Sequence, residues 1–440
     1  MAETFFFYDL ETSGTDPRSD RIMQFAGQRT DMELKPIGEP YNVKVKLDED
    51  VLPNPDAVLV TGITPQAVNS EGVSEIEFLK LFHQEAVKPG TIFVGFNNIR
   101  FDDEFIRHTL YRNFYDAYEW HWKDACSRWD MLDVVRMTRA LRPEGIEWPF
   151  GSNGDASNRL ELLTSVNKLE HENAHDALAD VSATIAVAGL IKAKQPKLFD
   201  YLLNKRSKEA VKEIATSGQP FVYVSGRFSS EFEKLAVVAS LGNHPVKSGC
   251  FVYDLRFDPT KYINLSKDEL VALWHYPKDE NDETLPVKVM QYNRCPAVAP
   301  LGVLLPAVAE RLSIDLKSVQ AHAKILADNP QFYERIVEAS TQLDADFKQT
   351  LLLADEKTVE HELYDGFISD QDKRLMKQVH STDTSQLQAL ADKFTDARLK
   401  GLLTLYKARN FPQSLSDEER QQWESYRRNF KNHFLGFSND

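Results

Sequence analysis

Residues 5–11 read FFFYDLE, and this short stretch decides how the N-terminal part of the chain folds. An apolar run of this kind is typical of a buried strand, whose successive side chains point to opposite faces. Asp9 and Glu11 therefore share one face with two of the phenylalanines. The two carboxylates project together where the strand ends in a polar loop, which is where α/β folds build their sites.

Three regions follow one another along the chain. Apolar strands alternate with helical segments over residues 1–194, which predicts an α/β domain. After a polar helical connector, strands return between Gly, Pro and Asn turns, and a small antiparallel barrel fits residues 219–300 within a second domain of residues 195–352. Helical spacing of apolar residues predicts a helical C-terminal domain of residues 353–440, whose polar start, LADEKTVEHELYDG (353–366), is expected to be a linker.

Composition narrows the class of protein. A chain of 440 residues with 42% apolar and 27% charged residues is typical of a globular protein with several domains. No run approaches the ~20 apolar residues of a membrane span, and the N-terminus has no targeting pattern, so we expect a cytoplasmic protein without membrane contact. We also expect a monomer. The three cysteines are far apart and fit a reduced compartment. With a net charge of −15, any nucleic-acid groove must be locally basic, and an acidic metal site is compatible.

Two later segments add polar groups to the strand end. TIFVGFNNIRFDDEF (91–105) is a buried strand that leads through a polar turn into a helix, and it places Asp102 or Asp103 at the helix start. ENAHDALADVSATIAVAGLI (172–191) is a helix with His175 and Asp180 beside its first turns, and its expected buried stripe consists of Ala177, Leu178, Val181, Ile185 and Ala188. Each segment also has a plain structural interpretation, because an Asp at a helix start can be an N-cap and a lone His is more often a surface or capping residue.

Together the segments contain three ordered motifs: D-x-E-T at residues 9–12, N-x-x-F-D at 98–102 and H-x-x-x-x-D at 175–180. They resemble the motifs of the DEDDh exonuclease superfamily. The chain is most similar to its bacterial exonuclease I family, on the stretches NNIRFDDEFIRHTLYRNFYDAYEW, SRWDMLDVVR and NAHDALADV, and on LYDGF and YKARNFP further downstream. The resemblance covers nearly the whole chain and implies a ribonuclease-H-like exonuclease domain, an SH3-like β-barrel domain and a helical C-terminal domain.

The resemblance also implies an activity. Its members remove nucleotides from the 3′ end of single-stranded DNA in repair and recombination, and they associate with the single-stranded-DNA-binding protein. Two Mg²⁺ ions, for which Mn²⁺ can substitute, are the implied cofactor. Carried over by motif, the catalytic set is Asp9, Glu11, Asp102, His175 and Asp180. Asp103 stays open as an alternative for the third carboxylate.

These residue types suit phosphodiester cleavage, in which two hard cations neutralise charge on the attacked phosphate and are bound by oxygen ligands. We predict that Asp9 bridges both ions, that Glu11 and Asp180 bind them further, and that Asp102 is a ligand or supports the ligands. Four convergent carboxylates would repel one another without cations. An imidazole titrates near neutrality, so His175 is the predicted general base. The resemblance also suggests that Glu11 meets the terminal 3′ hydroxyl.

Single strands are held by stacking rings and phosphate contacts, and the chain between Phe96 and Phe150 is rich in aromatic and basic residues. The predicted DNA-binding residues are Tyr118, Trp122, Arg107, Arg136 and Arg159. Any one ring can instead belong to the core, and any one Arg can pair with a surface carboxylate.

Two other functions remain in competition. A related exoribonuclease or a proofreading exonuclease would use the same five groups, but the two extra domains argue against these compact relatives. A non-catalytic nucleic-acid-binding scaffold would be expected to have lost at least one of the five groups, and all five are present.

Overall fold

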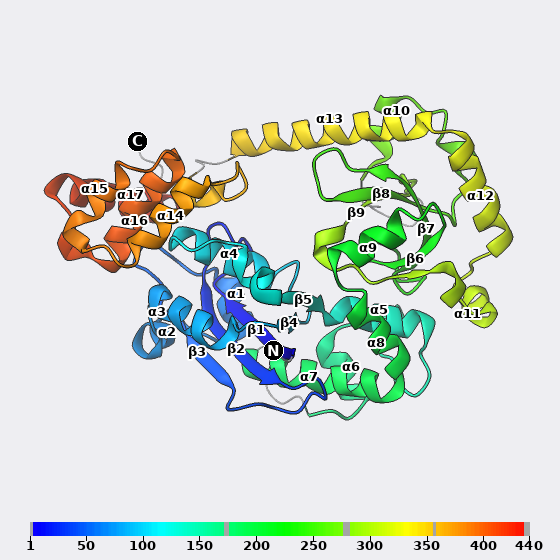
Figure 1. The fold of residues 1–440 in the computed structure, drawn as a ribbon, viewed down its shortest axis with the longest axis horizontal. Coiled ribbons are helices and arrows are strands. Elements are labelled where there is room, and N and C mark those ends of the chain that lie inside the picture. The colour runs from blue at the N-terminus through cyan, green and yellow to red at the C-terminus, as the bar shows by residue number, and fades with distance from the viewer. Residues whose placement is uncertain (1–2, 171–175, 276–281, 355–357, 435–440) are drawn as a thin grey trace.

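The computed structural model describes residues 3–170, 176–275, 282–354 and 358–434. The chain forms three lobes (Figure 1). We call them the N-terminal lobe (β1–β5 and α1–α8), the barrel lobe (β6–β10 and α9–α13) and the C-terminal lobe (residues 358–434). The long helix α13 (Gln331–Ala354) runs from the barrel lobe toward the C-terminal lobe. Both of these lobes lie beside the N-terminal lobe.

The N-terminal lobe is a mixed five-stranded sheet of order β3-β2-β1-β4-β5. Strand β1 pairs antiparallel with β2 and parallel with β4, and β4 pairs parallel with β5. The strands are β1 Thr4–Thr12, β2 Ile22–Thr30, β3 Tyr41–Lys44, β4 Thr91–Gly95 and β5 Ser127–Asp130. The helices are α1 Pro55–Thr61, α2 Pro65–Glu71, α3 Glu75–Leu81, α4 Asp102–Arg112, α5 Met131–Leu141, α6 Leu160–Val166, α7 Ala177–Lys194 and α8 Pro196–Asn204.

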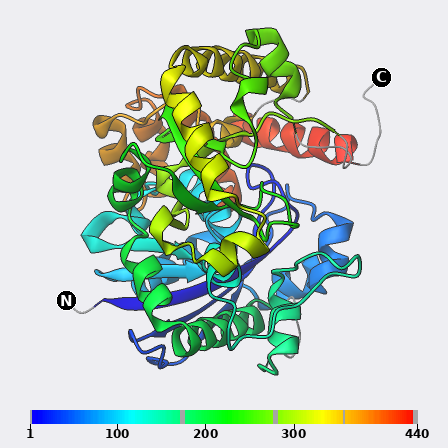
Figure 2. The ribbon, with the colours of Figure 1, turned by 90° about the vertical axis from the view of Figure 1, so that its right-hand side faces the viewer.

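The side chains of β1 divide between the two faces of this sheet as the alternation predicts. Phe5 and Phe7 are buried in a cluster with residues of α5 and α7, whereas Phe6 and Tyr8 are buried in a separate cluster with residues of α3 and α4. Helix α7 lies along one face of the sheet (Figure 2). Because Asp9 continues the face of Phe5 and Phe7, it points toward α7.

The predicted stripe of α7 is only partly correct. Ala177, Val181 and Ala188 are buried, but Leu178 and Ile185 are only partly buried against the same cluster. The helix is covered on more than one side, because residues of the sheet, of α6 and of α8 all contact it. Its buried surface is therefore wider than one narrow stripe.

The barrel lobe is an antiparallel five-stranded sheet of order β10-β6-β7-β8-β9, which confirms the predicted strands. Its strands are β6 Phe221–Val224, β7 Leu235–Asn243, β8 Gly249–Asp254, β9 Val287–Gln291 and β10 Val298–Pro300. Its helices are α9 Lys208–Ala215, α10 Lys267–Leu273, α11 Pro306–Arg311, α12 Leu316–Asp328 and α13. Ser266 and Glu269 form the capping box that starts α10.

The C-terminal lobe is helical, as predicted, with α14 Asp370–Val379, α15 Leu387–Ala391, α16 Ala397–Asn410 and α17 Asp417–Phe434. The prediction of a polar linker is wrong for residues 358–366, which the structure describes in this lobe. Residues 359–362 form a 3-10 turn whose Glu360 is 4% exposed and accepts hydrogen bonds from Arg21 and Arg409. Arg409 also binds Asp50 at 2.6 Å, so this segment docks the lobe onto the N-terminal lobe. No helix within the described ranges combines the length and the hydrophobicity of a transmembrane span.

Candidate active site

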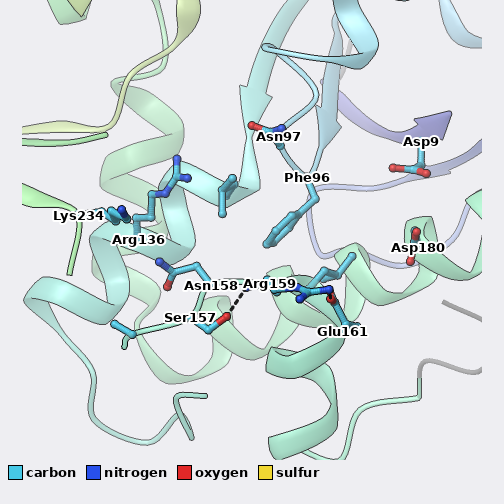
Figure 3. Close-up of a pocket in the computed structure, with 13 residues that line it drawn as sticks. Asp9, Phe96, Asn97, Arg136, Ser157, Asn158, Arg159, Glu161, Asp180 and Lys234 are labelled. Carbon is cyan, nitrogen blue, oxygen red and sulfur yellow. Dashed lines mark hydrogen bonds and ion pairs between the residues drawn. The ribbon is translucent and has the colours of Figure 1, made fainter. Parts of the chain in front are cut away.

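Three carboxylates from two elements meet at the end of β1. Asp9 and Glu11 come from β1 and Asp180 from the first turns of α7, and each offers an oxygen within 4.8 Å of the others. Asp9 and Asp180 face each other at one end of the cavity in Figure 3. Asp9 and Asp180 are partly buried, and Glu11 is 8% exposed. The sequence predicts this convergence, and the geometry can hold a metal ion.

The start of α7 is fixed beside the carboxylates by Asp176. Its carboxylate accepts hydrogen bonds from the backbone N–H groups of Leu178 and Ala179 at 3.1 and 3.2 Å, which caps the helix. A second oxygen of Asp176 accepts a hydrogen bond from the buried Gln24 on β2 at 3.1 Å. This contact ties α7 to the sheet, so Asp180 is held over the end of β1. Asp176 directly follows His175 in the chain but is not one of the residues that the third motif predicts.

Asp102 is the first residue of α4 and is 3% exposed. Its negative charge helps to raise the pKa values of both Asp9 and Glu11, so it lies near the three-carboxylate cluster without belonging to it. Burial, and then the charges of Asp103 and Asp130, raise the pKa of Asp102 to about 8, although backbone N–H groups oppose the shift.

The electrostatics of the site fit a divalent cation. Burial, followed by the charges of Asp180, Asp102 and Asp176, raises the pKa of Glu11 to about 8. Burial and neighbouring carboxylates likewise raise the pKa of Asp9 well above its usual range. Within the part of the chain that the structure describes, no Lys or Arg forms an ion pair with Asp9, Glu11 or Asp102. Buried oxygen donors without a basic partner need cations or protons, and Mg²⁺ or Mn²⁺ matches this donor set.

Asp103 is occupied elsewhere. It is fully buried and accepts hydrogen bonds from the Tyr8 hydroxyl and the Arg128 guanidinium. Tyr8 belongs to the opposite face of β1 from Asp9, so Asp103 points away from the cluster. The geometry therefore favours Asp102 as the third carboxylate. His175 lies outside the described residues.

A cavity of about 490 Å³ extends from the carboxylates (Figure 3). It runs from Asp9 and Asp180 past Phe96 to Arg136 and Lys234. Its other lining residues are Asn97, Leu132, Ala156, Ser157, Asn158, Arg159, Leu160 and Glu161. Lys234 comes from the barrel lobe, directly before β7, so the cavity lies where two lobes meet. The cavity is acidic at the cluster and basic at its far end, which suits a phosphate chain whose terminus reaches the carboxylates.

The sequence missed several of these lining residues. Lys234 and Asp9 are too far apart in sequence for a local pattern to link them. Asn97 adopts a left-handed backbone conformation with φ 70°, which Asn tolerates better than most residues. An Asn after a buried strand is therefore a sequence signal for a turn at this position.

The predicted arginines differ in their surroundings. Arg159 is the most accessible, with 69% of its side chain exposed and an ion pair to Glu161 at the edge of the cavity. Arg136 lines the cavity and pairs with Asp133 at 2.7 Å. Arg107 is 8% exposed and donates to Glu104 at 2.8 Å. In this structure Arg107 therefore pairs with a carboxylate, which is the alternative to a phosphate contact.

The two predicted stacking rings also differ. Trp122 is 59% exposed. Tyr118 is partly buried against apolar residues of the C-terminal lobe, with the Arg107 guanidinium 5.6 Å from its ring centre. Trp122 is therefore the more accessible of the two rings.

The fold and this acidic site define the chain as an exonuclease. The family model described as Exonuclease matches residues 6–188, and the models of the Exonuclease I SH3-like domain and the Exonuclease I C-terminal domain match residues 206–342 and 357–435. Exodeoxyribonuclease I of Escherichia coli K12 is 43% identical over 97% of this chain and 89% of its own length. The chain belongs to the exodeoxyribonuclease I family.

Solved structures agree over almost the entire chain. The zinc-bound complex of E. coli exonuclease I with single-stranded DNA has a TM-score of 0.90 and 42% identity, and the match covers 99% of this chain and 92% of that one. A complex of SSB and exonuclease I has a TM-score of 0.89 and 41% identity, with the same coverage. These matches confirm the predicted ribonuclease-H-like domain, SH3-like barrel and helical C-terminal domain.

Proposed function

We propose that the chain is a 3′-to-5′ exonuclease that hydrolyses single-stranded DNA to nucleoside monophosphates. The observation that carries this proposal is the convergence of Asp9, Glu11 and Asp180 at the acidic end of a cavity whose other end is basic. A strand terminus placed at the carboxylates leaves its preceding phosphates toward Arg136 and Lys234. The E. coli relative, whose structure contains single-stranded DNA, supports the choice of substrate.

The site would hold two Mg²⁺ ions, for which Mn²⁺ can substitute, on Asp9, Glu11, Asp180 and Asp102. When bound, the ions supply positive charge to the attacked phosphate and lower the pKa of the attacking water. Asp9, whose ligand oxygen lies within 4.8 Å of those of both Glu11 and Asp180, would contact both ions. The zinc in the related structure and the convergence of three carboxylates within 4.8 Å of one another support a metal here.

Two further roles belong to the chain's own side chains. His175, the histidine of the third motif, takes the proton from the attacking water and passes it to solvent, because an imidazole titrates near neutrality. Glu11 is buried beside the cluster and has a raised pKa of about 8, so it can also accept or donate a hydrogen bond to the terminal 3′ hydroxyl.

The DNA is held outside the cluster by the basic and aromatic residues. Arg159 and Arg136 are proposed to contact phosphates, and Trp122 and Tyr118 to stack on bases, with the exposed Trp122 contributing more. Arg107 supports this surface through its pair with Glu104 and its contact with Tyr118.

The remaining assignments concern the whole protein. We propose domains of residues 1–194, 195–352 and 353–440, which lie close to the three family-model matches. The protein acts as a cytoplasmic monomer in DNA repair and recombination. Like the relative crystallised with SSB, it associates with the single-stranded-DNA-binding protein.

The test is digestion of 5′-labelled single-stranded DNA, duplex DNA and RNA, with Mg²⁺ or with chelator. We expect a ladder of products shortened from the 3′ end on single-stranded DNA alone, and no cleavage in chelator. Preferential digestion of RNA would favour the exoribonuclease alternative. Binding of DNA without any cleavage in Mg²⁺ or Mn²⁺ would favour the scaffold alternative.

A further inference from the structure

Helix α4 begins with three consecutive acidic residues whose side chains go to three different places. Asp102 lies beside the carboxylate cluster, as described above. Asp103 and Glu104 do not reach the cluster, but each is bonded to residues from other parts of the molecule. The first turn of α4 therefore connects the candidate active site to its surroundings, and the connections involve all three lobes.

Asp103 connects this turn to the sheet and to the barrel lobe. The Tyr8 hydroxyl, one residue before Asp9, donates to its carboxylate, and the side chain of Asn98 donates to Tyr8 at 3.0 Å. Arg128 on β5 donates to Asp103 through one nitrogen and, through another, to the backbone carbonyl of Asn293 in the barrel lobe at 2.7 Å. Asp103 is fully buried, so this set of contacts is internal.

Glu104 joins the same turn to both outer lobes. One carboxylate oxygen accepts hydrogen bonds from Arg107 at 2.8 Å and from Arg294 of the barrel lobe at 3.2 Å. The other oxygen accepts a hydrogen bond from the hydroxyl of Tyr364 in the C-terminal lobe. Arg294 also donates to the carbonyl of Ile99 at 3.3 Å, in the turn that precedes α4.

The Glu104 side chain is 13% exposed and Arg294 is 36% exposed, so the contacts are partly shielded from solvent and the residues can be substituted without opening the core. Ion pairs of this kind are stronger than surface pairs when several donors share one carboxylate.

We propose that Glu104 is a positioning residue that holds Asp102 in place for metal binding, by fastening the first turn of α4 to the barrel and C-terminal lobes. The inference rests on the proposed function. A helix turn moves as a unit, so a shift of the turn that carries Glu104 also shifts Asp102, two residues earlier. Residues that orient metal ligands commonly contribute about 10- to 100-fold to metal affinity.

The test uses two substitutions of opposite charge. Glu104→Gln removes a negative charge and Arg294→Gln removes a positive one, yet both remove the ion pair between Glu104 and Arg294. Mn²⁺ binding is measured by electron paramagnetic resonance without DNA, and Mg²⁺-dependent cleavage is measured at saturating single-stranded DNA. Tyr364→Phe breaks the third contact without changing charge. Glu119→Gln, which breaks a surface pair with Lys123, is the matched control.

If the contacts position Asp102, Glu104→Gln and Arg294→Gln should both weaken Mn²⁺ binding by about 10-fold, Tyr364→Phe should weaken it less, and the control should not change it. The combined loss in the double variant should be smaller than the sum of the two single losses, because both substitutions remove the Glu104–Arg294 contact. The kcat at limiting Mg²⁺ should fall with unchanged thermal midpoints.

Two results would overturn the inference. If the charge substitutions shift Mn²⁺ binding in opposite directions and cancel in the double variant, Glu104 acts only through its electric field. If both variants bind Mn²⁺ like the wild type, Glu104 has no influence on the site. A wild type that neither binds Mn²⁺ nor cleaves DNA would instead contradict the proposed function.

Discussion

Glu11→Gln should make the metal-free protein more stable, although it removes a proposed ligand. The pKa of Glu11 is raised from 4.5 to about 8 in the folded protein. A folded-state pKa above the unfolded value means that folding binds a proton, so folding stability falls as pH rises between these two values. Each pKa unit corresponds to about 1.4 kcal/mol. Relative to a side chain that does not titrate, the raised pKa of Glu11 therefore costs the folded protein about 1 kcal/mol at pH 5 and about 3 kcal/mol at pH 7.

Denaturant unfolding in chelator at pH 5, 6 and 7 measures this difference directly. We expect Glu11→Gln to exceed the wild type in unfolding free energy by up to about 3 kcal/mol at pH 7 and by much less at pH 5. Glu338→Gln, on an exposed position of α13, should behave like the wild type. Saturating Mg²⁺ should reverse the order, because it stabilises the folded wild type more than the variant. A variant that is less stable than the wild type in chelator, by the same amount at every pH, would refute the reasoning.

Three further predictions concern other parts of the molecule. Trp122→Ala should weaken single-strand affinity by about 1–3 kcal/mol with little change in thermal midpoint, since the ring is 59% exposed; a large loss of stability with normal affinity would place the ring in the core. His175→Ala should lower turnover by about 100-fold and remove the acidic limb of the pH–rate profile, and near-normal turnover with an unchanged limb would assign the proton to another group. Glu360→Gln should cost about 3–5 kcal/mol in unfolding free energy, because Arg21 and Arg409 would be left buried without their shared partner; a wild-type denaturation curve would contradict this.

The central part of the fold follows from local sequence patterns. The alternation in β1 places Asp9 and Glu11 on one face, and the helical spacing after His175 places Asp180 on α7, so their meeting needs only that α7 packs on that face. The strand β5 and the strand β10 were not predicted. Each has only three or four residues, too few for an alternation to be distinguished from a turn.

Contacts between residues far apart in the chain could not be predicted in the same way. Asp102 and Asp103 are adjacent acids at the start of one helix, and the sequence does not distinguish their roles. In the structure Tyr8 and Arg128 donate hydrogen bonds to Asp103, whereas Asp102 lies beside the cluster. The segment around Glu360 is rich in charged residues, which is typical of a solvated linker. A segment that forms buried ion pairs has the same composition, so composition alone does not distinguish the two. The partners of Glu360 come from distant positions in the chain, and a single sequence does not reveal them.

The most direct test of the metal-bound carboxylate cluster is single-turnover cleavage by Asp9→Ala, measured with its single-strand affinity. Asp9 is the proposed ligand of both ions, whereas the proposed strand contacts of Arg136, Arg159 and Trp122 do not involve the cluster. The account predicts that Asp9→Ala in saturating Mg²⁺ leaves 5′-labelled single-stranded DNA uncut, as the wild type does in chelator, while it retains much of the wild-type affinity for that DNA. Robust shortening from the 3′ end by Asp9→Ala would contradict the account.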